Sequence, residues 1–215
     1  TPIKSSAASD VYKRQVSKID GILKIRRDAL VAVNSLGEMM IASRHGDFPI
    51  KKGDKVAGTR IIPLVIEKEK MDAAEKAAGN LPIFDILPYQ QKKVGIVTTG
   101  SEIKKGLIQD TFTPVLREKL SGFPTEVTGQ VMPGDDKEEI TKAILSFADA
   151  GADLIFCTGG MSVDPDDRTP GGIRDTGAKI ITYGAPVLPG AMLLVAYLER
   201  NGRSIPVLGL SLIHI

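Results

Sequence analysis

From residue 93 onward, short apolar runs alternate with segments of helical periodicity, and this alternation limits the fold more than any other feature. The runs are short and β-branched, as expected for strands buried on both faces of a sheet. Between them, Ile140, Ile144 and Ala148 keep the spacing of one helix face. Strand, helix and strand in this order form right-handed crossovers, so the pattern predicts an α/β fold with a mainly parallel sheet covered by helices on both faces. We expect strands at 94–98, 126–131, 154–157, 178–183 and 205–210, and helices at 113–120 and after Asp136.

The preceding residues, 16–90, do not continue this alternation and predict a small α+β or β-rich domain. Residues 55–66 favour a strand, which Pro63 confines to a sheet edge or divides in two. Residues 67–78 are strong helix formers, and Gly79 suits the end of that helix. We place the boundary near residue 90, so that residues 91–210 form the second domain. The first domain shows no motif that suggests chemistry.

The two ends of the chain, residues 1–15 and 211–215, differ in character from the rest. Both resemble the translated adapter sequence found at the ends of metagenomic gene models, and we expect them to be non-native, with a native disordered tail as the alternative. Residues 1–15 carry three of the cations and one of the anions, which accounts for the whole formal net charge of +2. The remaining chain is neutral and gives no reason to expect a nucleic-acid partner, since a polyanion binder needs a concentrated basic face.

Composition excludes several classes of site. The 215 residues contain a single cysteine, Cys157, so no internal disulfide framework can form, which fits the reducing cytoplasm. No apolar run reaches the roughly 18 residues of a membrane-spanning helix, so we expect no membrane partner. His214 lies in the C-terminal end segment, which leaves His45 as the one remaining histidine. A histidine-based metal site or a Ser-His-Asp triad is therefore not expected.

Two loops of small residues follow predicted strands at the edge where parallel sheets bind ligands. The first is Thr98-Thr99-Gly100-Ser101-Glu102, and the second is Thr158-Gly159-Gly160-Met161-Ser162. Small residues let the backbone approach a ligand, and free N–H groups with hydroxyls favour an anion such as phosphate. Each loop alone could be a plain turn between a strand and a helix. Two of them on neighbouring strands predict a cradle that holds a phosphate from both sides.

Acidic residues follow strands at the same predicted edge. Asp135 and Asp136 come after the second strand, and Asp166 and Asp167 come after the second loop. Carboxylates repel a phosphate unless a divalent cation lies between them, and Mg²⁺ favours a few carboxylates together with phosphate oxygens. We therefore expect Asp135, Asp166 and Asp167 to serve magnesium. Helix capping and Asp-Pro turns are the alternative, and capping is the stronger interpretation for Asp136.

Together these motifs resemble the molybdenum-cofactor biosynthesis (molybdopterin-binding) domain. That domain occurs in molybdopterin adenylyltransferases, in molybdopterin molybdenumtransferases and in the competence/damage-inducible family. The resemblance covers residues 92–210. Its motifs are Thr99-Gly100-Ser101-Glu102 with Gly106 and Asp110, Pro-Gly-Asp-Asp at 133–136, Thr158-Gly159-Gly160-Met161-Ser162 followed by Asp167-x-Thr169-Pro170, and Pro189-Gly190.

The resemblance implies that both loops and Pro189-Gly190 bind molybdopterin, while Asp135 and Asp167 act in catalysis and hold magnesium. It implies a transferase that adenylylates molybdopterin or inserts molybdenum, with ATP or adenylylated molybdopterin as a further ligand, in a homodimer or homotrimer. The alternatives are a non-catalytic carrier or sensor of molybdopterin and a nucleotide pyrophosphatase of the competence-inducible type.

Three features depart from the family pattern. Ala191 stands where the molybdenumtransferase pattern has Lys after Pro-Gly. Gly209-Leu210-Ser211 stands where the family continues Gly-Leu-Pro-Gly, so we expect the domain to be truncated at its C-terminus. Residues 1–90 do not match the usual front end of a molybdenumtransferase, so an exact orthologue is not expected.

Overall fold

The computed structural model of the chain describes every residue except 1–2, 5–12, 64, 163–166, 189 and 212–215. The chain divides into two compact units, Thr1–Tyr89 and Gln90–Ile215. Within the described ranges, no helix is both long and apolar enough to cross a membrane.

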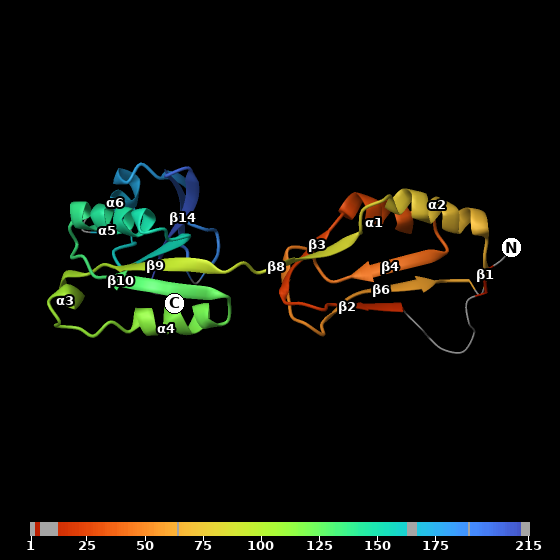
Figure 1. The fold of residues 1–215 in the computed structure, drawn as a ribbon, viewed down its shortest axis with the longest axis horizontal. Coiled ribbons are helices and arrows are strands. Elements are labelled where there is room, and N and C mark those ends of the chain that lie inside the picture. Colours follow the sequence, from red (N-terminus) through yellow and green to blue (C-terminus); the bar gives the residue numbers. More distant parts are fainter. Residues whose placement is uncertain (1–2, 5–12, 64, 163–166, 189, 212–215) are drawn as a thin grey trace. The chain divides into compact units, whose positions relative to one another are not determined.

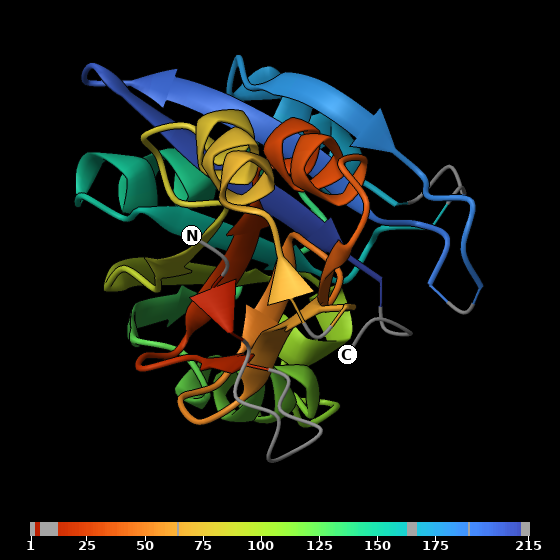
Figure 2. The ribbon, with the colours of Figure 1, turned by 90° about the vertical axis from the view of Figure 1, so that its right-hand side faces the viewer.

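The first unit consists of antiparallel strand pairs and two helices (Figure 1). One three-stranded sheet has the order β2-β6-β4, another has the order β5-β3-β8, and β1 pairs with β7. Helices α1 and α2 lie side by side (Figure 2) and bury Met39 and Ile66 between themselves and the strands. The bounds are β1 Ile3–Lys4, β2 Lys13–Val16, β3 Gly21–Ile25, α1 Arg27–Asn34, β4 Met39–Ser43, β5 Phe48–Ile50, β6 Lys55–Ile61, β7 Val65–Ile66, α2 Lys68–Ala78 and β8 Phe84–Pro88.

A proline interrupts a strand of this unit and a glycine follows the end of a helix, both at the positions that the sequence predicts. Pro63 divides the strand expected at 55–66, because β6 ends at Ile61 and β7 begins at Val65. Helix α2 ends before Gly79, whose φ of 71° a residue with a Cβ rarely adopts. Part of the N-terminal end segment takes a regular conformation, since β2 pairs with β6.

The second unit is an α/β domain around a six-stranded sheet of order β10-β9-β11-β14-β13-β12. Strand β9 runs parallel to β10 and β11, and β11 runs parallel to β14, whereas β13 is antiparallel to both of its neighbours. The expected mainly parallel sheet is confirmed. The bounds are β9 Lys92–Thr98, α3 Ser101–Lys104, α4 Phe112–Ser121, β10 Thr125–Val131, α5 Lys137–Asp149, β11 Leu154–Thr158, α6 Thr169–Asp175, β12 Lys179–Tyr183, β13 Leu194–Arg200 and β14 Arg203–Leu210.

Helices cover both faces of this sheet, with α5 and α6 on one face and α4 on the other (Figure 1). Val97 of β9 belongs to the core that α5 and α6 bury, whereas Ile96 belongs to the core under Leu116 and Leu120 of α4. Successive side chains of a strand point to opposite faces. Strand β9 is therefore apolar and buried from Val94 to Val97, where both of its faces are covered.

One strand departs from the simple alternation of strand and helix. Strands β13 and β14 form an antiparallel hairpin, joined by Asn201 and Gly202 with φ of 51° and 72°. Asn-Gly with two positive φ angles is typical of a tight hairpin turn, because that turn follows the twist of the flanking strands. Strand β13, which the predicted strands do not include, is thus a reversed strand inside the sheet.

Candidate functional site

The carboxyl ends of β9 and β11 meet at one edge of the sheet, which we call the rim. The chain leaves β9 toward β10 on one side, and leaves β11 toward β14, β13 and β12 on the other. Such a reversal between adjacent strands opens a crevice at the carboxyl edge, where α/β proteins bind ligands. The loops that follow these strands, 99–101 and 159–162, therefore lie where a ligand site is expected.

Thr99 holds the two predicted loops together. Its backbone N–H donates to the Thr158 carbonyl at 2.8 Å, and its hydroxyl lies 3.2 Å from the same oxygen. The Thr99 hydroxyl is also 3.0 Å from the hydroxyl of Thr169, which in turn donates to the Gly159 carbonyl at 2.8 Å. Both threonines are buried. The structure thus brings Thr99 of the first loop next to Thr158, Gly159 and Gly160 of the second.

Close approach of the two loops requires the glycine at position 159. A Cβ atom there would lie 2.5 Å from the Thr99 carbonyl oxygen, and one at Gly160 would lie 2.9 Å from the Thr169 hydroxyl. Gly159 and Gly160 have φ of 84° and 52°, in the left-handed region that glycine adopts without strain. Met161 is buried and packs against Gly209, since a Cβ atom added to Gly209 would lie 2.5 Å from the Met161 Cε. Ser162 is exposed.

Asp135 belongs to the same rim and contacts the first loop. Its Oδ2 accepts a hydrogen bond from the Ser101 N–H at 2.8 Å, and its own N–H lies 3.4 Å from the Ser101 hydroxyl oxygen. One carboxylate oxygen is therefore engaged at the start of α3. The Glu102 side chain is exposed on the same short helix.

The other acidic residues have separate environments. Asp136 is the N-cap of α5, where its side chain accepts from the Glu139 N–H at 2.9 Å, and capping is confirmed for this residue. Asp167 is half-buried, and no hydrogen bond or ion pair joins it to another described residue. Asp166 lies outside the described residues. Among the residues that are described, no group of three or more His, Cys, Asp or Glu could hold a metal ion.

Tyr183, which the sequence did not mark, also contacts the second loop. Its hydroxyl lies 3.0 Å from the carbonyl oxygens of both Met161 and Ser162. Burial of the phenol and, to a smaller extent, the Asp167 carboxylate raise the pKa of Tyr183, so the hydroxyl stays a donor. Gly190 is buried in the loop that follows β12, whereas Pro189 lies outside the described residues.

Gln130, which the sequence did not mark, joins Thr98 and Asp110 in a polar network beside the first loop. The Gln130 side-chain amide on β10 donates to Asp110 Oδ2 at 2.6 Å, and it lies 3.0 Å from the Thr98 hydroxyl and 2.8 Å from the Thr113 hydroxyl. Asp110 Oδ1 accepts from the backbone N–H groups of Phe112 and Thr113. Burial alone would raise the pKa of Asp110. The hydrogen bonds together have the larger effect and hold this pKa below its ordinary value.

The last two residues of β11 are fully buried. The Thr158 hydroxyl has no hydrogen-bond partner among the described residues. Thr158 directly precedes Gly159 in the second loop. Burial raises the pKa of the Cys157 thiol to about 12, which makes it an inert core side chain. An unpaired buried hydroxyl costs about 1–3 kcal/mol, so Thr158 offers hydrogen-bonding capacity beside the glycine loop.

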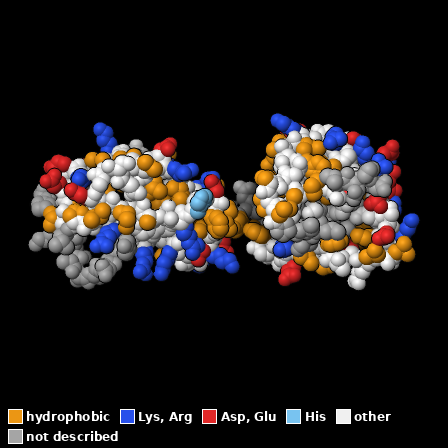
Figure 3. Space-filling view, turned by 180° about the vertical axis from the view of Figure 1, so that it is seen from behind, with side chains coloured by type: hydrophobic (Ala, Val, Ile, Leu, Met, Phe, Trp, Pro, Cys, Tyr) orange, Lys and Arg blue, Asp and Glu red, His pale blue; other side chains and the backbone are white. Residues whose placement is uncertain are grey.

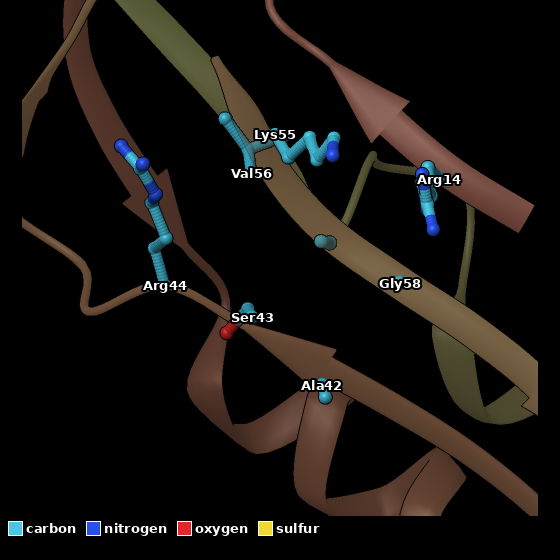
Figure 4. Close-up of a pocket in the computed structure, with 8 residues that line it drawn as sticks. Arg14, Ala42, Ser43, Arg44, Lys55, Val56 and Gly58 are labelled. Atoms are coloured by element: carbon cyan, nitrogen blue, oxygen red, sulfur yellow. The ribbon is translucent and has the colours of Figure 1, made fainter. Parts of the chain in front are cut away.

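The first unit carries a separate open hollow of about 320 Å³ on the β2-β6-β4 sheet (Figure 4). Arg14, Arg44 and Lys55 line it around Ala42 and Gly58. Lys and Arg side chains also gather along one side of this unit in the space-filling view (Figure 3). The Arg44 guanidinium is already paired with Asp54 at 3.0 Å. The hollow contains none of the residues that the sequence marks for chemistry.

The fold and the rim define a ligand-binding α/β domain, and comparison with known proteins identifies its family. The family model described as "Probable molybdopterin binding domain" matches residues 95–211, which is more than half of the chain. The chain therefore belongs to this family. The solved structure of the tungsten cofactor synthesizing protein MoaB from Pyrococcus furiosus has the same fold, with a TM-score of 0.50 and 24% identity over 57% of this chain and 82% of that one.

Two curated relatives match different shares of the chain. A CinA-like protein of Mycolicibacterium gilvum is 35% identical over 77 residues, which is 36% of this chain and 18% of the relative. A molybdopterin molybdenumtransferase of Haemophilus influenzae is 27% identical over 160 residues, which is 70% of this chain and 37% of the relative. The second unit alone contains less than 70% of the chain, so the second match continues into the first unit. The chain spans well under half the length of either relative.

Proposed function

We propose that the second unit binds molybdopterin at the rim and that the protein inserts molybdenum into it. The observation that carries the binding proposal is the convergence of the loops after β9 and β11, joined through Thr99, in a domain of this family. The backbone N–H groups of Gly160, Met161 and Ser162 donate to no residue that the structure describes. In this proposal they donate to phosphate oxygens, as loop N–H groups do in other anion sites.

One sequence match favours metal insertion over adenylyl transfer, because it extends beyond the second unit. The similarity to the molybdopterin molybdenumtransferase continues into the first unit, whereas the family model covers only the second. Molybdate is the substrate in this proposal. Its molybdenum forms bonds to the two dithiolene sulfurs of molybdopterin, and one of its oxygens leaves as water with the two thiol protons. In this proposal the first unit also takes part in metal insertion.

In this proposal magnesium binds at the rim together with the phosphate. Mg²⁺ binds through one or two carboxylates together with phosphate oxygens, rather than through a cage of protein ligands. Asp167 and the second oxygen of Asp135 are the carboxylates that would hold it, and Asp166 completes the expected set. Bound magnesium would neutralise the charge of a phosphate. The unpaired Thr158 hydroxyl supplies a further polar group beside the glycine loop.

Titration of the whole chain with molybdopterin, with and without Mg²⁺, tests binding. We expect Asp167→Ala to weaken binding only when Mg²⁺ is present. Asp175→Ala, which removes a carboxylate from the far end of α6, is the matched control and should not change it. Binding that is indifferent to Mg²⁺ and to Asp167 contradicts the magnesium assignment, and no binding at all contradicts the proposal.

Incubation with adenylylated molybdopterin and molybdate then tests insertion, with mature cofactor measured by reactivation of an apo-molybdoenzyme. Bound molybdopterin without insertion would instead support a carrier or sensor, which Ala191 in place of the family's Lys favours. The match to a CinA-like protein favours a second candidate, a nucleotide pyrophosphatase. Release of a nucleoside monophosphate from a dinucleotide would support that activity.

A further inference from the structure

Tyr183 reaches the second loop from outside the predicted motifs. It is the last residue of β12, and its hydroxyl lies 3.0 Å from each of the two carbonyl oxygens of Met161 and Ser162. A hydroxyl has one proton to donate, so these two bonds share it. The contact links strands that are separated by β14 and β13 in the sheet.

The direction of a carbonyl fixes the direction of the next N–H group. In a trans peptide the C=O of Met161 and the N–H of Ser162 belong to one plane and point in opposite directions. A carbonyl held toward the Tyr183 hydroxyl therefore turns the Ser162 N–H away from it. That N–H donates to no residue that the structure describes, and in this inference it is the group that meets the ligand.

A second contact restrains Met161. The Met161 side chain is 3% exposed and fills the space above Gly209. With its side chain fixed in the core and its carbonyl fixed by Tyr183, Met161 has little freedom to rotate its following peptide. Without the hydroxyl, the side-chain anchor alone leaves that peptide free to turn.

We propose that Tyr183 is a positioning residue that aims the Ser162 N–H at the phosphate of the bound pterin. This inference rests on the proposed function, because it requires a phosphorylated ligand at the rim. It assigns to Tyr183 no contact with the ligand. Tyr183 should therefore affect the binding of the phosphate group and not the binding of the pterin ring.

A pair of ligands separates this role from a general effect on folding. A stable oxidised pterin with its terminal phosphate and the same pterin without the phosphate are titrated against the wild-type chain, Tyr183→Phe and Tyr197→Phe. Tyr197 is a partly exposed tyrosine on the neighbouring strand β13 and serves as the matched control. We expect Tyr183→Phe to weaken binding of the phosphorylated pterin roughly five- to tenfold, the size of one lost hydrogen bond. Its affinity for the phosphate-free pterin and its melting temperature should match those of Tyr197→Phe.

Each other outcome overturns the inference. Equal weakening for both pterins would mean that Tyr183 shapes the whole pocket, and unchanged affinities would mean that the hydroxyl has no role in binding. If the wild-type chain binds the phosphate-free pterin as tightly as the phosphorylated one, the rim holds no phosphate and this inference fails while pterin binding stands. If it binds neither, the proposed function fails as well.

Discussion

Replacement of Gly159 by alanine tests whether the loops after β9 and β11 meet as closely as the structure has them. The new Cβ would lie 2.5 Å from the Thr99 carbonyl oxygen, which is backbone and cannot swing aside. Steric overlap of this kind costs about 1–3 kcal/mol. The φ of 84° adds about 1–2 kcal/mol for a residue with a side chain. We therefore expect Gly159→Ala to lower the unfolding free energy of the second unit by about 2–5 kcal/mol.

Gly177→Ala is the matched control for the backbone term. Gly177 has φ of 85°, but nothing lies within 4 Å of the position that its Cβ would take. Both variants carry the cost of a positive φ and the same change in the unfolded chain. The difference between their unfolding free energies therefore measures the steric overlap with Thr99. Native-state hydrogen exchange of amides in β9 and β11 measures the free energy of this unit within the whole chain. Equal destabilisation by the two variants would refute the close contact.

Three further predictions concern single side chains. Asp136→Ala should lower stability by about 1 kcal/mol through loss of the α5 cap, and Asp136→Ser should restore most of it, as thermal melts will show. The pKa of Asp110 is depressed in the folded state, so its stabilising effect is present above the ordinary Asp pKa of about 3.9 and is lost as pH falls through the folded value. Melting temperature measured against pH should therefore fall less steeply in acid for Asp110→Asn than for wild type. The Cys157 thiol, with its pKa raised to about 12, should resist alkylation at pH 8 until the chain is unfolded.

The strand ends and the two glycine loops could be predicted from the sequence because their signals are local. Apolar runs end at Thr98 and Thr158, small residues follow, and parallel pairing places both ends at one edge. The Asp136 cap depends only on its position before α5. The reversed strand β13 was missed even though Asn201-Gly202 is a local hairpin signal that could have revealed it.

The contacts of Tyr183 and Gln130 could not be predicted because they depend on tertiary distance. Tyr183 lies 21 residues from Ser162 along the chain, and Gln130 lies 32 residues from Thr98. Nothing in the surrounding sequence distinguishes either side chain from an ordinary strand residue. Their partners became visible only once the order of the strands in the sheet was known.

The pairing of β9 with β11 has a consequence for how this unit folds. Thr99 and Thr158 are 59 residues apart, and the bonds between them form only after the chain has passed through β10 and α5. Contacts between distant residues are slow to form because the entropy of closing the intervening loop is lost first. The two loops meet only when β9 and β11 are paired, so a ligand that binds both loops, as we propose, would stabilise the folded domain as a whole.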